Sequence, residues 1–389
     1  MAPPNSKSFS VSVVLPASGW EMIANVRRRP AGWPARWESR AGAESGTSRN
    51  RLGVRGGSRA TLQRQPFFPG VTRPDSVRPL HWREANAMAT TLLEPRSAAT
   101  DFDVEDVEYL RHGDKPLLAR IFKPRGTGPF PALVECHGGA WCLADRTTER
   151  LRHEYMAAHG IVSIALDFRS GDEAPYPASV QDINFAVRWA KANARSLETR
   201  PDLVGLSGQS SGGHLAMLVA MRPHDPRYAA IPLPAGSSSQ DAAVRCVIMS
   251  WPVINPLSRY RHAKRTAEGA NPPAWPSSII ARHDAYWRNE ANMAEGNPTM
   301  ALERGEKVLT PPAIWFQAQG DIVHDYKDVE SSFAGNEPQR FCAAYAKAGG
   351  SIALEYIDME RKAGASPDLS KCGPMFARMV EFVSEHVTD

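Results

Sequence analysis

The pentapeptide Gly208-Gln209-Ser210-Ser211-Gly212 has the residue types of a serine nucleophile. It follows an apolar run at residues 203–206 and precedes a helix-forming segment that begins at Gly213. A serine on a tight strand-to-helix turn projects its hydroxyl from the top of a sheet, and flanking glycines let strand and helix approach closely. The helix N-terminus also favours developing negative charge. The pattern predicts Ser210 as the nucleophile of an acyl-transfer reaction.

A second motif, His137-Gly138-Gly139-Ala140-Trp141, directly follows an apolar run at residues 132–136. Glycines in such a loop can turn their backbone N–H groups toward a substrate oxyanion. We expect the N–H groups of Gly138, Gly139 and Ser211 to form this oxyanion hole. His137 is interpreted as a residue that braces the loop, and His214 as a histidine packed within the helix after the serine.

The segment from residue 132 to 220 resembles the acetyl-esterase and hormone-sensitive-lipase-like branch of the α/β hydrolases. It is also similar to the branch that holds kynurenine formamidase and feruloyl-esterase-like enzymes. The matching residues are the two motifs above, Asp167-Phe168-Arg169, Tyr176-Pro177-Ala178 and Asp182. The resemblance extends more loosely over residues 102–387. It implies the α/β-hydrolase fold and hydrolysis of carboxylic esters through an acyl-enzyme, with no cofactor and no metal. It also implies bracing roles for Asp167, Arg169 and Asp182.

A serine needs an adjacent base, which in turn is oriented by an acid. In this fold the chain order is serine, acid, histidine. Asp321 follows the apolar run at residues 313–318, where the family keeps its acid, and Asp325 is the reserve candidate. We therefore predict Asp321 as the acid.

The base is harder to place, because the family's histidine follows the last strand. That strand is expected to end at residues 357–358, and residues 359–367 contain no histidine. Beyond Asp321 the chain holds only His324 and His386. His386 ends the final amphipathic helix, whose last turn we expect to lie far from Ser210.

His324 is the candidate base, because it follows Asp321 by three residues on a loop at the carboxyl edge of the sheet. Asp321 or Asp358 could orient it. Two alternatives stay open: His324 is a surface histidine, or the relay is broken, with Ala365 or a neighbour in the histidine's place. With His324 as the base, the sequence predicts a serine esterase. A broken relay predicts a catalytically impaired α/β hydrolase that binds a small molecule.

The elements that must position these residues alternate along the chain. Residues 104–111 and 117–123 alternate in polarity around a turn, which predicts an opening antiparallel hairpin. Apolar runs typical of buried parallel strands and segments with a helical period then follow in turn. This pattern predicts an α/β protein with a mostly parallel sheet and helices on both faces. The expected strands are 132–136, 161–168, 203–207, 244–251, 313–318 and 352–357, and the expected helices are 147–158, 179–194, 213–221, 337–348 and 374–386.

An excursion at about residues 252–312 interrupts this alternation. It contains eight prolines and the aromatic residues Tyr260, Trp275, Tyr286 and Trp287. Long excursions within a compact domain are usually functional, and aromatic side chains can wall a binding pocket. We expect an insert that acts as a partial cap, the alternative being a packed insert without a role in binding.

Residues 1–87 carry 14 Lys and Arg against 5 acidic residues, whereas the rest of the chain has a net negative charge. This Arg-, Gly-, Pro- and Ser-rich leader shows no helical or strand period and is expected to be disordered. It could bind nucleic acid or an anionic membrane, or act as a transit segment. Our preferred interpretation is upstream sequence before a true start at Met88, with the hydrolase domain at 88–389.

The overall composition, 42% hydrophobic and 23% charged, is ordinary for a globular protein. No apolar run approaches the ~18 residues of a transmembrane helix, and residues 9–15 are a weak signal-peptide core. The five cysteines lack metal-site spacing. We therefore expect a cytoplasmic protein with reduced thiols. Its partner would be a small-molecule ester, with no nucleic acid or membrane partner, and it could form a homo-oligomer.

Overall fold

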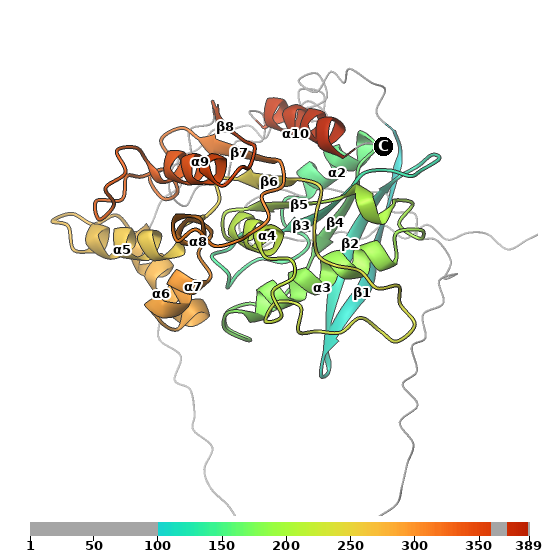
Figure 1. Ribbon diagram of the computed structural model, residues 1–389, viewed down its shortest axis with the longest axis horizontal. Helices are drawn as coiled ribbons and strands as arrows, with labels where there is room; N and C mark the ends of the chain where they lie inside the picture. The colour runs from blue at the N-terminus through green and yellow to red at the C-terminus, as the bar shows by residue number, and fades with distance from the viewer. Residues whose placement is uncertain (1–99, 359–371, 388–389) are drawn as a thin grey trace, which may run out of the picture. The chain divides into compact units, whose positions relative to one another are not determined.

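One eight-stranded sheet organises the molecule in the order β1-β2-β4-β3-β5-β6-β7-β8 (Figure 1). The computed structural model describes residues 100–358 and 372–387. β2 runs antiparallel to both of its neighbours, and all the other neighbouring strands are parallel. The strands are β1 (Phe102–His112), β2 (Lys115–Pro124), β3 (Ala132–Cys136), β4 (Val162–Leu166), β5 (Val204–Gln209), β6 (Val247–Ser250), β7 (Ala313–Ala318) and β8 (Ile352–Ile357).

Helices connect the strands on both faces of this sheet. They are α2 (Arg150–Ala158), α3 (Ala178–Ala192), α4 (Ser211–Met221), α5 (Pro256–Ala267), α6 (Trp275–Trp287), α7 (Glu290–Glu295), α8 (Pro298–Glu303), α9 (Glu337–Lys347) and α10 (Gly373–His386). A short 3-10 helix, η1 (Pro201–Leu203), leads into β5. The described residues belong to one compact unit, and the leader at 1–87 and Met88 lie outside them.

The alternation of side chains along β7 shows how the two faces are filled. Ala313 and Trp315 belong to the larger apolar core, which includes α3, α4 and α9. Ile314 and Phe316 belong to a second core with α2 and α10. Because successive side chains of a strand point to opposite faces, a strand buried on both faces is apolar throughout. The predicted α/β class, with a mostly parallel sheet and helices on both faces, is confirmed.

Several predicted strands and helices are longer than the observed ones, and the local backbone explains two of these differences. The strand expected to reach Trp251 ends at Ser250, since Trp251 adopts a φ of 37°, which a strand cannot contain. The helix expected from residue 147 begins at Arg150. Asp145 accepts hydrogen bonds from the backbone and side chain of Thr147, and Glu149 is left-handed, so a turn precedes the helix.

The excursion between β6 and β7 contains four helices, α5 to α8. Asn255, Asn289 and Asn297 cap the N-termini of α5, α7 and α8 through their side chains. A proline occupies one of the first two positions of α5, α6 and α8, where its missing N–H costs nothing. Three prolines of the excursion, Pro256, Pro276 and Pro298, are therefore at helix starts.

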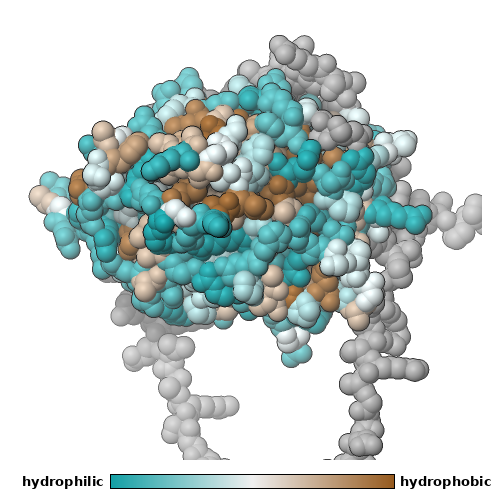
Figure 2. All heavy atoms as spheres, in the orientation of Figure 1, coloured by the Kyte–Doolittle hydropathy of each residue, from teal (hydrophilic) through white to brown (hydrophobic). Residues whose placement is uncertain are grey.

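The face shown in Figure 2 is mainly hydrophilic, with limited apolar areas. Large apolar side chains exposed on the described part of the chain are Leu143, Leu309, Ile322, Val329 and Tyr356. Leu143 follows the glycine-rich loop, and Ile322 lies between Asp321 and His324. Within the described residues, no helix is both long and apolar enough to cross a membrane.

Candidate active site

Ser210 lies on the sharp turn between β5 and α4, with φ 52° and ψ −116°. A non-glycine residue adopts this backbone only when its surroundings hold it there. Its N–H donates to the Ser250 carbonyl at 2.9 Å, and its own carbonyl accepts from the N–H of Val253 at 2.9 Å and of His214 at 3.2 Å. A Cβ on Gly212 would overlap the carbonyl oxygens of Cys136 and His137. Close packing against β3 thus explains the glycine in the turn.

The structure brings Ser210, His324 and Asp321 together in one hydrogen-bonded chain. Ser210 Oγ lies 2.9 Å from His324 Nε2, and His324 Nδ1 lies 2.8 Å from Asp321 Oδ2. All three residues are buried, with Asp321 only 1% exposed. A carboxylate on Nδ1 fixes the tautomer whose Nε2 can accept the serine proton. This geometry has the order in which the sequence predicts a nucleophile, a base and an acid.

The turn after β7 accounts for the position of acid and base. Gly320 adopts a φ of 71°, which turns the chain sharply at the end of the strand. The Asp321 carbonyl then accepts the His324 N–H at 3.1 Å, and Asp321 Oδ1 accepts the Val323 N–H at 3.2 Å. One turn of backbone therefore places the Asp321 and His324 side chains side by side beneath the serine.

The loop after β3 lies against the serine. A Cβ on Gly138 would stand 3.5 Å from the Cβ of Ser210, so this backbone lies directly against the serine. Three successive residues, Gly139, Ala140 and Trp141, have positive φ values of 103°, 51° and 63°. Ser211 supplies the first N–H of α4 beside Ser210. The loop and the helix start thus adjoin the serine, as a pair of oxyanion-binding segments would.

The two histidines near the motifs are both buried. The ring of His137 stacks on Phe168 with centroids 4.0 Å apart, and its Nδ1 lies 2.9 Å from the Gly138 carbonyl. Burial lowers the pKa of His137. His214 does more than pack, because Trp141 Nε1–H donates to its Nδ1 at 3.2 Å. Motif and periodicity did not indicate this bond, since its partners are far apart in the sequence.

The other candidates for acid and base lie elsewhere. Asp325 accepts a hydrogen bond from Asn336 Nδ2 at 2.6 Å, and Asp358 is exposed just beyond β8. His386, at the end of α10, packs its ring against Phe382. Ala365 and the segment 359–367 lie outside the described residues.

The family residues Asp167, Arg169 and Asp182 form buried or half-buried ion pairs. Arg169 binds both carboxylate oxygens of Asp182, at 2.8 Å and 2.9 Å, and its backbone N–H donates to the same group. Asp167 accepts from the Arg146 guanidinium at 2.9 Å. These contacts tie the segment after β4 to α3 and to the loop before α2.

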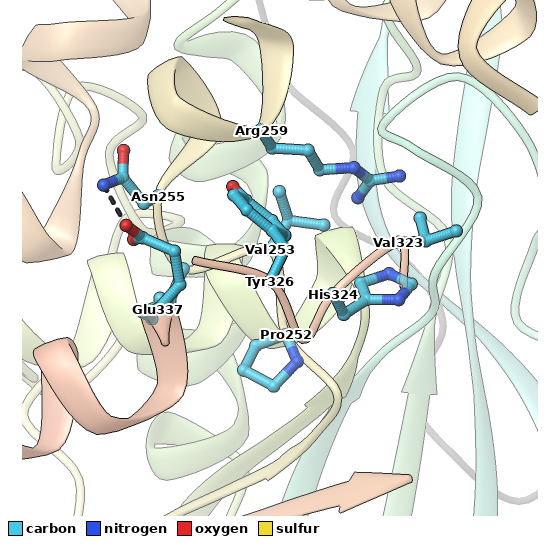
Figure 3. Close-up of a pocket in the computed structure, with 9 residues that line it drawn as sticks. Pro252, Val253, Asn255, Arg259, Val323, His324, Tyr326 and Glu337 are labelled. Carbon is cyan, nitrogen blue, oxygen red and sulfur yellow. Dashed lines mark hydrogen bonds between the residues drawn. The ribbon is translucent and has the colours of Figure 1, made fainter. Parts of the chain in front are cut away.

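A small cavity adjoins His324 (Figure 3). The apolar residues Pro252, Val253 and Val323 line one part of it, and Asn255 and Glu337 are joined there by a 2.9 Å hydrogen bond. Figure 3 shows Arg259 extending from α5 toward the side of His324. Among the described residues, no group of three or more His, Cys, Asp or Glu is arranged to hold a metal ion.

Comparison with curated proteins finds esterases and lipases. Esterase LipC of Mycobacterium tuberculosis is 34% identical over 138 residues, which is 34% of this chain and 34% of that protein. Versiconal hemiacetal acetate esterase of Dothistroma septosporum is 30% identical over 149 residues, or 38% of this chain and 43% of that protein. Lipase 2 of a Moraxella species is 26% identical over 208 residues, covering 50% and 48%. The matches span about a third to a half of the length of these relatives.

Solved structures share the fold over most of the chain. The carboxylesterase EstE1 from a metagenomic library has a TM-score of 0.56 and 17% identity, covering 79% of this chain and 95% of its own. A fungal esterase of Rhizomucor miehei has a TM-score of 0.55 and 17% identity, covering 77% and 88%. These likenesses confirm the α/β-hydrolase fold. The family model described as BD-FAE matches residues 120–321, from β2 to Asp321 and slightly more than half of the chain, so this protein belongs to the BD-FAE family of the α/β-hydrolase superfamily.

Proposed function

We propose that this protein is a serine hydrolase that cleaves carboxylic esters through an acyl-enzyme on Ser210. The observation that carries the proposal is the hydrogen-bonded chain from Ser210 Oγ to His324 Nε2, at 2.9 Å, and from His324 Nδ1 to Asp321, at 2.8 Å. These distances fit general-base activation of a serine. The esterase names of the relatives support the same reaction class.

In the acylation step Ser210 Oγ attacks the ester carbonyl while His324 Nε2 takes the serine proton. Asp321 stabilises the imidazolium that forms and keeps its ring oriented. The backbone N–H groups of Gly138, Gly139 and Ser211 would hold the negative oxygen of the tetrahedral intermediate. Each donor of this kind is typically worth about 10²–10³ in rate. The intermediate collapses when His324 delivers the proton to the departing alcohol oxygen.

Deacylation uses the same groups with water as the nucleophile. His324 Nε2 removes a proton from water, the hydroxide adds to the acyl carbonyl, and the oxyanion is held as before. Collapse breaks the bond to Ser210 Oγ, which regains the proton from His324. The products are a carboxylic acid and a free enzyme, so the reaction needs no cofactor.

The surroundings support an apolar ester of modest size as substrate. Leu143 and Ile322 are about half exposed beside the glycine-rich loop and beside His324. A contiguous exposed apolar surface can mark a ligand-binding site. Pro252, Val253 and Val323 add apolar surface to the cavity at His324. The part of this proposal that concerns the substrate rests on these side chains.

A binding protein without turnover is the weaker alternative. Its motivation is the missing histidine after the last strand, in the segment beyond Asp358. His324 supports turnover instead, because it reaches Ser210 from the turn after β7. We also propose a cytoplasmic location, which the free thiols of Cys136, Cys142, Cys246 and Cys342 support.

Hydrolysis of short-chain p-nitrophenyl esters tests the function, with wild type, S210A and H324A compared. We expect S210A and H324A each to lower kcat by at least about 10³-fold. H386A is the matched control, because His386 lies on α10 and contacts Phe382. A fluorophosphonate should label Ser210, located by mass spectrometry. Undiminished hydrolysis by S210A, or wild type without any ester turnover, contradicts the proposal.

A further inference from the structure

The backbone of the glycine-rich loop is strained. Ala140 and Trp141 are not glycines, yet both adopt left-handed φ values of 51° and 63°. Such a conformation costs roughly 1–2 kcal/mol per residue and persists only where the surroundings hold it. The loop must supply N–H groups at fixed positions beside Ser210. Something outside the loop therefore has to stabilise this backbone.

The side chain of Trp141 is the anchor of the loop, and it is 1% exposed. Its indole stacks on Tyr286 with centroids 5.4 Å apart and planes 5° apart, and it meets Trp287 and His283 edge-on. These three partners all belong to α6 of the insert. The Trp141 carbonyl also accepts the Gly171 N–H at 2.8 Å. The insert thus packs against the loop through one aromatic side chain, that of Trp141.

His214 joins Trp141 to a second part of the insert. Its Nδ1 accepts the indole Nε1–H at 3.2 Å, so the proton of the neutral ring is on Nε2. That Nε2–H donates to the Gly296 carbonyl at 2.7 Å, between α7 and α8. His214 is fully buried on α4, four residues after Ser210. Both ring nitrogens are therefore used in one directed bridge.

The far end of this bridge is itself held firmly. A Cβ on Gly296 would stand 2.7 Å from Trp287 Cζ3 and 2.8 Å from Tyr176 Cε2, so the backbone is packed against both rings. The neighbouring Glu295 accepts hydrogen bonds from Arg222 at 2.9 Å and from the Tyr176 hydroxyl. The segment at 295–296 thus offers His214 a carbonyl at a fixed position.

We propose that His214 is a positioning residue that holds the oxyanion loop through the bond to Trp141 and couples this loop to the insert through Gly296. The inference rests on the proposed function. It gives the insert a role in catalysis beyond covering a pocket. His214 does not touch the reacting atoms; its effect is on where the Gly138 and Gly139 N–H groups lie. Removal of the His214 hydrogen bonds should therefore lower kcat and leave KM nearly unchanged.

The primary test compares ester hydrolysis by wild type, H214F and H214N in the full-length protein. H214F keeps an aromatic ring but loses both bonds, and we expect kcat to fall about 10- to 100-fold with KM changed less than about twofold. H214N keeps an acceptor near the position of Nδ1 and should recover part of the loss. W141F, which keeps the ring and loses the N–H, should resemble H214F.

The matched control is H153F. His153 is equally buried, on α2, and neither of its ring nitrogens has a hydrogen-bond partner within the described part of the chain. H153F replaces a buried histidine with phenylalanine, as H214F does, but away from the oxyanion loop. Its kcat should therefore stay within about twofold of wild type. An H214F protein with wild-type kcat overturns the inference. An equal fall in kcat in H153F and H214F also overturns the inference, because a general loosening of the packed core would then explain both.

A readout without activity separates this inference from the proposed function. The indole ¹⁵N–¹H resonance of Trp141, assigned by its loss in W141F, should shift in H214F and exchange faster with solvent. An unchanged resonance means that the bond does not form. If wild type hydrolyses no ester and a fluorophosphonate does not label Ser210, the proposed function fails while the resonance still tests the bridge.

Discussion

Asp321 and His324 are three residues apart, and their side chains are joined by a 2.8 Å hydrogen bond within a single turn after β7. One loop thus supplies both the proposed acid and the proposed base. A short turn of this kind leaves little freedom between the two groups, because the Asp321 carbonyl also accepts the His324 N–H. The imidazole can therefore be aimed at Ser210 without a histidine from the segment after β8.

We predict that D321N lowers kcat by about 10³–10⁴-fold with little change in KM. The amide NH2 donates to Nδ1, so the imidazole carries its proton on Nε2 and cannot accept the proton of Ser210. Steady-state hydrolysis of a p-nitrophenyl ester measures this. D325N is the control, because Asp325 binds Asn336 and its kcat should stay within a few-fold of wild type. The reverse ranking of the two variants would assign the acid to Asp325.

The serine turn leads to a prediction about stability. G212A should destabilise the fold by at least about 3 kcal/mol, because the new methyl group overlaps the Cys136 and His137 carbonyl oxygens of β3 and its loop. G269A serves as a milder comparison, since Gly269 is exposed just after α5 and a Cβ there would meet only the Thr266 carbonyl oxygen, at 3.3 Å. Urea unfolding followed by circular dichroism measures both. Equal stability of G212A and wild type would mean that the turn is less closely packed.

A buried ion pair provides the third prediction. Asp182 is fully buried and accepts bonds from Arg169 and from His112 Nε2. D182A leaves the Arg169 guanidinium without this partner, and removal of one member of such a pair typically costs about 3–5 kcal/mol. E108Q, at the exposed pair with Arg111, should change the free energy of unfolding by less than about 1 kcal/mol. Similar effects in the two variants would contradict a bracing role for Asp182.

The sheet could be predicted from the sequence because each buried parallel strand is a short apolar run. β3, β7 and β8 begin and end at the predicted residues. Ser210 and the glycine-rich loop could be predicted for the same reason, since the residues that form each are contiguous and follow a strand. Local sequence was therefore sufficient to predict the strand-to-helix turn at Ser210 and the position of the loop after β3.

The position of His324 could not be decided from the sequence. Whether it reaches Ser210 depends on the turn at Gly320 and on the path of β6 and β7 relative to β5, which are tertiary properties. The bridge from Trp141 through His214 to Gly296 joins three distant segments, so no periodicity indicates it. The insert helices were not predicted, although Asn255-Pro256 and Asn297-Pro298 are signatures of capped helix starts.

The buried histidines predict that the fold loses stability as the pH falls below about 6.5. Burial lowers the pKa of His214 to about 4 and that of His283 to about 3. In the unfolded chain each has a pKa near 6.5, so below that pH the unfolded state binds more protons and is favoured. The stabilisation is complete above pH 6.5 and is lost progressively as the pH falls toward the folded pKa. Between pH 7 and pH 5 each of the two histidines should lower the free energy of unfolding by about 2 kcal/mol.

Urea unfolding at pH 7 and pH 5 measures this loss in wild type, H214F and H283F. Each variant removes one buried titrating group, so its free energy of unfolding should depend less on pH, by about 2 kcal/mol over this interval. H224A is the control for the loss of a histidine, because His224 is exposed on the surface. A pH dependence in H214F that equals that of wild type would mean that His214 is already protonated at pH 5. Its Nδ1 could then not accept the Trp141 N–H under those conditions, and the oxyanion loop would lose this support in mild acid.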